Sequence, residues 1–231
     1  MDDIEFIKEI ETEYDVASIK VNNIQIWPFL RIHYAFAYLN KYLLNAPEKE
    51  HIPLSNKKNR IANIFYGFKN LFRRYDYLIF SDTMELRIFD NKYFNKLAHS
   101  VIKYLGENNT LLIENPVAGS HFKHSQRLNK NVISLDIFRF LCYLYPFKKR
   151  LLIEKEEILK EINTHYDLDI DYKEISNKFF IYVFLFGIFI KVYKPKLIFI
   201  SSYYVTIYQA LIHAARFGGV KVIELQHGSI D

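Results

Sequence analysis

The stretch that decides the fold lies near the carboxyl end of the chain. It consists of an apolar run, Lys196-Leu197-Ile198-Phe199-Ile200-Ser201-Ser202, a helical segment from Tyr203 to Phe217, the pair Gly218-Gly219, and a second apolar run, Val220-Lys221-Val222-Ile223-Glu224-Leu225. Each run has the length of a buried strand, and the glycine pair is a typical helix end. Strands joined through a helix are parallel, and the crossover is right-handed. The pattern predicts a βαβ unit.

Working outward, three more apolar runs have the same character: residues 75–81, 110–114 and 131–135. Helical sequence fills the gap between Ser81 and Thr110, and residues 136–146, 150–165 and 173–193 are also predicted to be helices. Strands that alternate with helices form a parallel sheet that is covered on both faces. The fold class is therefore α/β, with a parallel sheet of about five strands and helices on both faces.

A helical amino-terminal arm is expected to precede the sheet. Residues 2–12 form a helix capped by Asp2 or Asp3, residues 21–26 are extended, and a long helix begins at Trp27-Pro28. Proline is well tolerated in a first helical turn because its missing N–H would have no partner there. We place the arm at residues 1–55 and the sheet domain at residues 56–231.

Composition limits the class of protein. The 231 residues contain one cysteine, Cys142, which excludes an internal disulfide and a cysteine-rich metal site and fits a reducing cytoplasm. The acidic amino terminus does not look like a signal peptide. The most apolar segment, residues 179–190, is too short to span a bilayer of about 30 Å, so we expect a buried helix there. The predicted location is cytoplasmic.

The net charge is +5, and part of it lies in a basic amphipathic segment, residues 59–72. We expect one helix there, with two alternatives for its apolar side. It either packs on the sheet or lies on the anionic inner face of the cytoplasmic membrane, which would make the protein peripheral. The chain contains no recognisable nucleic-acid-binding module, so nucleic acid is not an expected partner.

Ligands of open parallel sheets bind beyond the carboxyl ends of the strands. Polar residues follow three of the predicted strands, and they are the candidate site residues. Asp82 and Glu85 can act as a base that deprotonates a hydroxyl, although Asp82 can equally cap the next helix. Arg87 can bind phosphate or pair with Glu85. Ser201 and Ser202 are candidate ligands for substrate or phosphate.

The third strand end carries Gln226, His227, Gly228 and Ser229. A histidine followed by glycine can present its imidazole to a cleft, because glycine lets a substrate approach the backbone. Its ordinary pKa suits general acid–base catalysis or phosphate binding. We predict a catalytic role for His227, with Gln226, Gly228 and Ser229 binding substrate or phosphate. The alternative is a histidine that only satisfies loop carbonyl groups.

No cofactor or metal is expected. His121 and His124 have a metal-compatible spacing, but no third ligand is in view. The sequence has no Gly-x-Gly-x-x-Gly or P-loop pattern, which disfavours a dinucleotide oxidoreductase or a P-loop ATPase. It also has no Asp-x-Asp pair for a metal-dependent sugar donor.

The segment 218–228 resembles the turn, strand and Gln-His-Gly loop of bacterial GT-B-type glycosyltransferases that build capsular and surface polysaccharides. Residues 23–31 and 80–87 are similar to further stretches of the same family. The resemblance implies the Rossmann-like amino-terminal half of a two-domain transferase. That half receives the acceptor, while a carboxyl-terminal half holds the nucleotide sugar.

This resemblance implies transfer of a sugar from a nucleotide sugar to a growing, lipid-linked surface polysaccharide. The sequence ends three residues after Gly228, so we expect the carboxyl half to be absent or supplied by a separate chain, and the chain alone to be inactive. Two alternatives remain. One is a non-catalytic scaffold or binding module of a polysaccharide-assembly complex, and the other is a nucleotide-sugar epimerase-like protein.

Overall fold

The computed structural model describes residues 2–44, 57–116, 121–145 and 151–225, with the backbone alone for residues 57–60. The chain forms two compact units, Met1–Ile52 with Pro146–Phe180, and Pro53–Tyr145 with Ile181–Asp231. The long helix α7, Tyr172–Tyr193, contributes residues to both. The helical unit thus includes residues 146–180, a segment that the sequence-based boundary gave to the sheet domain.

The helical unit begins with α1, Asp3–Glu13, and the expected cap is present. The Asp2 carboxylate accepts a hydrogen bond from the Glu5 backbone N–H at 2.7 Å, and the Glu5 carboxylate accepts one from Asp2 at 3.1 Å. This reciprocal pair satisfies two of the free donors at the helix start. The other elements are the hairpin strands β1 (Lys20–Val21) and β2 (Ile24–Gln25), α2 (Trp27–Tyr38) with a π-helical turn (Leu39–Leu43), and α6 (Glu156–His165).

Stacked aromatic rings hold these helices together. The Phe6 ring lies 4.1 Å from the Tyr38 ring, and the Phe29 ring lies 3.8 Å from that of Phe179, in the first part of α7. Phe6, Phe29 and Phe179 are fully or almost fully buried. Aromatic pairs in such positions add about 0.5–1.5 kcal/mol to the free energy of area burial. The unit therefore has its own core.

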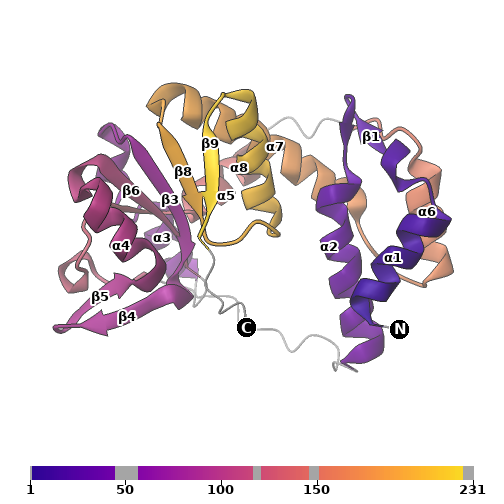
Figure 1. Ribbon diagram of the computed structural model, residues 1–231, viewed down its shortest axis with the longest axis horizontal. Helices are drawn as coiled ribbons and strands as arrows, with labels where there is room; N and C mark the ends of the chain where they lie inside the picture. Colours follow the sequence, from indigo (N-terminus) through magenta and orange to yellow (C-terminus); the bar gives the residue numbers. More distant parts are fainter. Residues whose placement is uncertain (1, 45–56, 117–120, 146–150, 226–231) are drawn as a thin grey trace. The chain divides into compact units, whose positions relative to one another are not determined.

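The second unit is built on a five-stranded, fully parallel sheet (Figure 1). Its strands are β3 (Tyr77–Asp82), β6 (Thr110–Asn115), β7 (Val132–Ser134), β8 (Leu197–Ile200) and β9 (Lys221–Glu224). Their spatial order is β7-β6-β3-β8-β9, so the chain starts in the middle, builds one side, and returns to build the other. This is the Rossmann-like order, and it confirms the predicted fold class.

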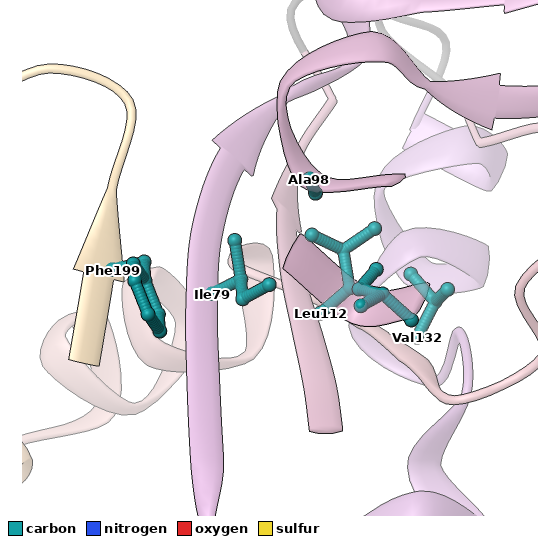
Figure 2. Packing of buried hydrophobic residues seen from close by; sticks show 6 residues of the cluster. Ile79, Ala98, Leu112, Val132 and Phe199 are labelled. Atoms are coloured by element: carbon teal, nitrogen blue, oxygen red, sulfur yellow. The ribbon is translucent and has the colours of Figure 1, made fainter. Parts of the chain in front are cut away.

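Different helices pack on the two faces of the sheet. Ile79 and Leu112 point to one face, where they pack with Ala98 of α4 (Lys96–Leu105), as Figure 2 shows. Phe80 points to the opposite face, because side chains alternate along a strand. Its ring contacts Phe186 of α7 at 5.8 Å and Tyr208 of α8 at 6.3 Å. This second face is covered by α5 (Asp136–Leu144), α7 and α8 (Thr206–Phe217).

The stretch between β3 and β6 corrects one expectation, because it is only partly helical. After a short 3₁₀ turn, Thr83–Glu85, the chain forms an antiparallel hairpin of β4 (Leu86–Phe89) and β5 (Lys92–Asn95), and only then α4. The hairpin turn is Asp90-Asn91, with φ of 48° and 56°. Asn and Asp tolerate this left-handed conformation, and such a pair closes a two-residue hairpin.

The basic segment 59–72 is also not one helix. Helix α3, Lys57–Ile64, ends before Gly67, which has φ of 70°, and a separate 3₁₀ helix spans Phe68–Phe72. A Cβ atom on Gly67 would lie 1.8 Å from the Val132 carbonyl oxygen. Close contact with β7 therefore requires glycine and a left-handed backbone, and this breaks the predicted helix.

Helix α7 is longer than the segment that hydropathy marked. It has 22 residues, and among the described helices it is the one long and apolar enough to cross a membrane by length and composition. Phe186, Phe189 and Ile190 are buried in the sheet unit, but only 28% of the most apolar 18-residue window is buried, so the expectation of a buried helix is met only in part. Phe184 and Ile188 are about half exposed, so the helix is apolar on its solvent side too.

Candidate functional site at the carboxyl edge of the sheet

The strand order places a topological switch point between β3 and β8. The chain leaves β3 toward one side of the sheet and leaves β8 toward the other, so the connections diverge at the carboxyl edge. In open α/β sheets this is where ligands bind. Asp82 ends β3, Asn115 ends the neighbouring β6, and Ser201 follows β8.

These three residues come together, and with Tyr208 we call them the Asp82 cluster. The Asn115 amide donates a hydrogen bond to one Asp82 oxygen at 2.6 Å, and the Ser201 hydroxyl donates to the other at 3.5 Å. The Asp82 side chain does not cap the following 3₁₀ turn, so the capping alternative is wrong. Asp82 is held instead by neutral donors from both neighbouring strands.

The pKa of Asp82 is raised above the ordinary value, and burial is the main cause. The hydrogen bonds from Asn115 and Ser201 and the more distant charge of Arg139 oppose this effect without cancelling it. The Arg139 guanidinium makes its own ion pair with Asp136 at 2.7 Å. The Asp82 carboxylate therefore lacks a direct cationic partner among the described residues.

Tyr208 of α8 is the fourth residue of the Asp82 cluster. It is 1% exposed, and burial together with the nearby Asp82 charge raises the pKa of its hydroxyl. The hydroxyl lies close enough to the side chains of Asp82 and Ser201 for hydrogen bonding to both to affect its pKa, although neither meets strict hydrogen-bond geometry.

This arrangement can accept a proton. A carboxylate in a low-dielectric edge, held by neutral donors and with a raised pKa, is a better base than an exposed aspartate. Hydroxyl groups of a ligand can also bind to it, because an ionised carboxylate accepts several hydrogen bonds. Proton abstraction from a hydroxyl is the simplest chemistry that fits.

The other residues proposed near β3 are less free. Glu85 pairs with Lys96 at 3.3 Å, so the alternative ion pair between Glu85 and Arg87 does not form. Arg87 is exposed in β4, and its guanidinium donates to the Met84 and Leu86 carbonyl oxygens at 3.0 and 2.8 Å. Neither residue contacts Asp82 directly. Ser202 is buried beside Ser201.

The residues proposed at the third strand end, Gln226, His227, Gly228 and Ser229, lie outside the described residues. Strand β9 runs parallel to β8, and Glu224 pairs with Ile200 in the register. The carboxyl end of β9 is therefore at the same sheet edge as Asp82. A shared site for Asp82 and His227 stays a prediction.

A second polar cluster at the same edge was not predicted. Glu114, with no exposed surface, forms a two-fold ion pair with Arg127, both bonds being 2.8 Å long. His121 bridges Glu114 at 3.2 Å and Ser134 at 2.8 Å. We call Glu114, His121, Arg127 and Ser134 the Glu114 cluster. Glu114 is a strand-end carboxylate like Asp82, which is a usable sequence signal, but Arg127 belongs to a loop without any pattern.

The electrostatics of the Glu114 cluster differ from those of Asp82. Burial alone would raise the pKa of Glu114, but the His121 hydrogen bond and the Arg127 charge outweigh it and hold the pKa below the ordinary value. The rings of His121 and His124 stack on Tyr66 at 4.2 and 4.3 Å. Within the described ranges, no three His, Cys, Asp or Glu side chains gather as a metal site.

The strand order defines a Rossmann-like α/β unit, and the Asp82 carboxylate lies at the switch point of its sheet. Comparison with known proteins adds no family: no family model, no curated protein and no solved structure matches this chain.

Proposed function

We propose that the sheet unit is the acceptor-side half of a GT-B-type glycosyltransferase in surface polysaccharide assembly, with Asp82 as the general base. The observation that supports this proposal most is Asp82 itself: a half-buried carboxylate with a raised pKa, at the switch point, held by Asn115 and Ser201. The resemblance around residues 218–228 supplies the reaction class. The donor is a nucleotide sugar and the acceptor a saccharide hydroxyl.

In this proposal the chemistry of the edge is simple. An acceptor hydroxyl hydrogen-bonds to the free lone pairs of Asp82, and its proton passes to the carboxylate as the oxygen attacks the anomeric carbon. The bond between that carbon and the nucleotide diphosphate breaks, and the diphosphate leaves with the electron pair. Asn115 and Ser201 hold the carboxylate in place, which fixes the geometry of attack. His227 is proposed as a second catalytic or phosphate-binding group.

Asp82 is a better candidate for the base than Glu85. Glu85 already pairs with Lys96 at 3.3 Å, whereas Asp82 is held by neutral donors and has no cationic partner among the described residues. Arg87 would bind phosphate only after its hydrogen bonds to the Met84 and Leu86 carbonyl oxygens break. We place no metal or cofactor in the reaction.

The test uses binding and transfer together. The purified chain is applied to an array of oligosaccharides to measure binding. The bound glycans are then offered with a panel of nucleotide sugars after a carboxyl-terminal GT-B half has been supplied, and products are measured by mass spectrometry. Asp82→Asn keeps the size of the side chain and removes the base. We expect it to retain glycan binding within about fivefold and to lower any transfer rate by about 10²–10⁴-fold.

Asp76→Asn is the matched control, because Asp76 precedes the same strand at the opposite edge and pairs with Lys196 on the surface. It should leave both readouts unchanged. A chain that binds no glycan and transfers no sugar would contradict the acceptor-side proposal. Glycan binding without transfer by any donor, even after a carboxyl-terminal half has been supplied, would favour the scaffold or binding-module alternative.

A further inference from the structure

A cavity of about 740 Å³ lies at the amino edge of the sheet, on the side opposite to Asp82. Its walls come from the second half of α7, the segment that leads into β8, and the end of α8 with the Gly218-Gly219 turn. All of these elements belong to the sheet unit. The volume is within the range of sites for small ligands, about 300–1,000 Å³.

The floor of the cavity is apolar. Val183, Ile190 and Ala214 line it, and Ile190 and Ala214 are also part of the buried core. Gly187 leaves the wall open: a Cβ atom at this position would find no other atom within 4 Å. Glycine inside a helix costs about 0.5–1 kcal/mol relative to alanine. Because Gly187 has no side chain, space remains beside α7 that a larger residue would fill.

The rim is basic. Lys191, Lys194 and Lys196 line the cavity, and none of the other described lining residues is acidic. Lys196 pairs with Asp76 at 2.8 Å, whereas the Lys191 and Lys194 side chains form no ion pair or hydrogen bond with any residue that the structure describes. The Phe217 ring stands at the same rim and is 70% exposed.

Two helix ends offset part of this positive charge. Helices α7 and α8 both end at the cavity, and each carboxyl terminus carries about half a negative charge from its free carbonyl groups. Three lysines, offset by Asp76, leave roughly two positive charges, and the helix ends remove about one. A positive balance remains at the mouth of an apolar cavity.

We propose that this cavity binds an amphipathic anion, an alkyl chain that carries a phosphate-type headgroup. The chain lies along Val183, Gly187 and Ala214, and the headgroup lies between Lys191 and Lys194. This combination follows from charge complementarity: an inorganic anion would leave the apolar floor wet, and a neutral apolar molecule would leave the lysines without partners. The site is independent of the proposed chemistry at Asp82, because it lies at the other sheet edge.

The experiment measures binding by calorimetry with three probes below their micelle concentrations. Dodecyl phosphate has the alkyl chain and the anion, pentaethylene glycol monododecyl ether has the alkyl chain with an uncharged headgroup that is not a saccharide, and inorganic phosphate has the anion alone. We expect the protein to bind dodecyl phosphate at least tenfold more tightly than either of the other two. Equal binding of the dodecyl ether would overturn the proposal, as would the absence of saturable dodecyl phosphate binding.

Two variants test the location. Gly187→Leu fills the cavity and raises helix propensity, so it should fold while binding dodecyl phosphate at least tenfold more weakly. Lys191→Gln with Lys194→Gln should weaken binding to the same degree. The control is Lys92→Gln with Lys103→Gln, two exposed lysines elsewhere in the sheet unit. Thermal unfolding confirms folding, and unchanged affinity in Gly187→Leu would contradict the assignment.

Vesicles separate the two sources of such a ligand. Sedimentation with phosphatidylcholine vesicles that contain phosphatidylglycerol, lost in the double lysine variant, would identify a bilayer lipid. Binding of dodecyl phosphate without sedimentation would identify a soluble alkyl phosphate. Asp82→Asn should change neither result, so failure of the proposed glycosyltransferase function and failure of this site remain distinguishable.

Discussion

Glu114 and Asp82 are carboxylates at the ends of neighbouring strands of one sheet, and their pKa values are shifted in opposite directions. In the register, Asp82 pairs with Asn115 and Ser81 with Glu114, so Asp82 and Glu114 point to opposite faces. Glu114 meets Arg127 and His121 and has a lowered pKa, whereas Asp82 meets only neutral donors and has a raised pKa.

The difference shows how a polar strand end can serve structure or chemistry. The Glu114 cluster is closed: both carboxylate oxygens bind a buried guanidinium, and His121 is fixed from both ring nitrogens. The Asp82 cluster is open: within the part of the chain that the structure describes, the carboxylate has no cationic partner, and the buried Tyr208 hydroxyl lies beside it. We infer that the closed cluster stabilises the fold, and that the open one is the better candidate for function.

The largest effect should come from breaking the closed cluster. Arg127→Met leaves the Glu114 charge buried without its main partner, and we expect the free energy of unfolding to fall by about 3–5 kcal/mol in urea titrations. Arg139→Met, which breaks the more exposed pair with Asp136, should cost no more than about 1 kcal/mol. Adding Glu114→Leu to Arg127→Met should recover most of the loss. Equal losses for the two arginines would contradict the comparison.

A smaller loss of stability should follow from substitution of Gly67, which follows Tyr66 in the chain and lies against Val132. Gly67→Ala must adopt φ near 70° and place a Cβ atom against the Val132 carbonyl oxygen. We expect a loss of about 2–4 kcal/mol, from backbone strain and overpacking together. Gly187→Ala, in an open helical position, should instead stabilise by about 0.5–1 kcal/mol, as thermal unfolding can measure. A neutral Gly67→Ala would show that the contact with β7 yields easily.

The pH dependence should separate the two carboxylates. Since the folded-state pKa of Glu114 is lowered, its contribution to stability is present above about 4.5 and is lost as the pH falls through the folded-state value. The slope in that range should be at most about 1.4 kcal/mol per pH unit for this group. In Glu114→Gln this part of the acid slope should be absent from urea titrations between pH 3 and 6. An unchanged slope would mean that Glu114 is not responsible.

The smallest effect concerns Asp82 and has the opposite sign. Its folded-state pKa is raised, so the folded protein holds the proton more tightly, and the favourable contribution at low pH is lost as the pH rises through that pKa. Asp82→Asn should therefore be about 0.5–1 kcal/mol more stable than the parent at pH 7, with a smaller difference near pH 3. Asp76→Asn is expected to show no such gain. Destabilisation of Asp82→Asn at pH 7 would argue against the open cluster.

Much of the fold could be predicted from the sequence, because apolar runs with strand length and helices with their spacing are local signals. All five strands and the parallel arrangement were expected, and so was the place of Asp82 at a strand end. The hairpin at residues 86–95 was missed because its strands are short and mostly exposed, so they carry no burial pattern. The break at Gly67 was missed because its cause is a contact with Val132, which is distant in sequence.

The sequence by itself determined where the strands end and which residue types stand there, since burial and chain connectivity act along the chain. Only the tertiary structure decided what each strand-end group meets. Glu114 and Asn115 differ by one position, and the pleat sends them to opposite faces, one toward Arg127 and the other toward Asp82. The charge state of a carboxylate depends on neighbours within a few ångströms, and here those neighbours come from loops and strands up to 119 residues away.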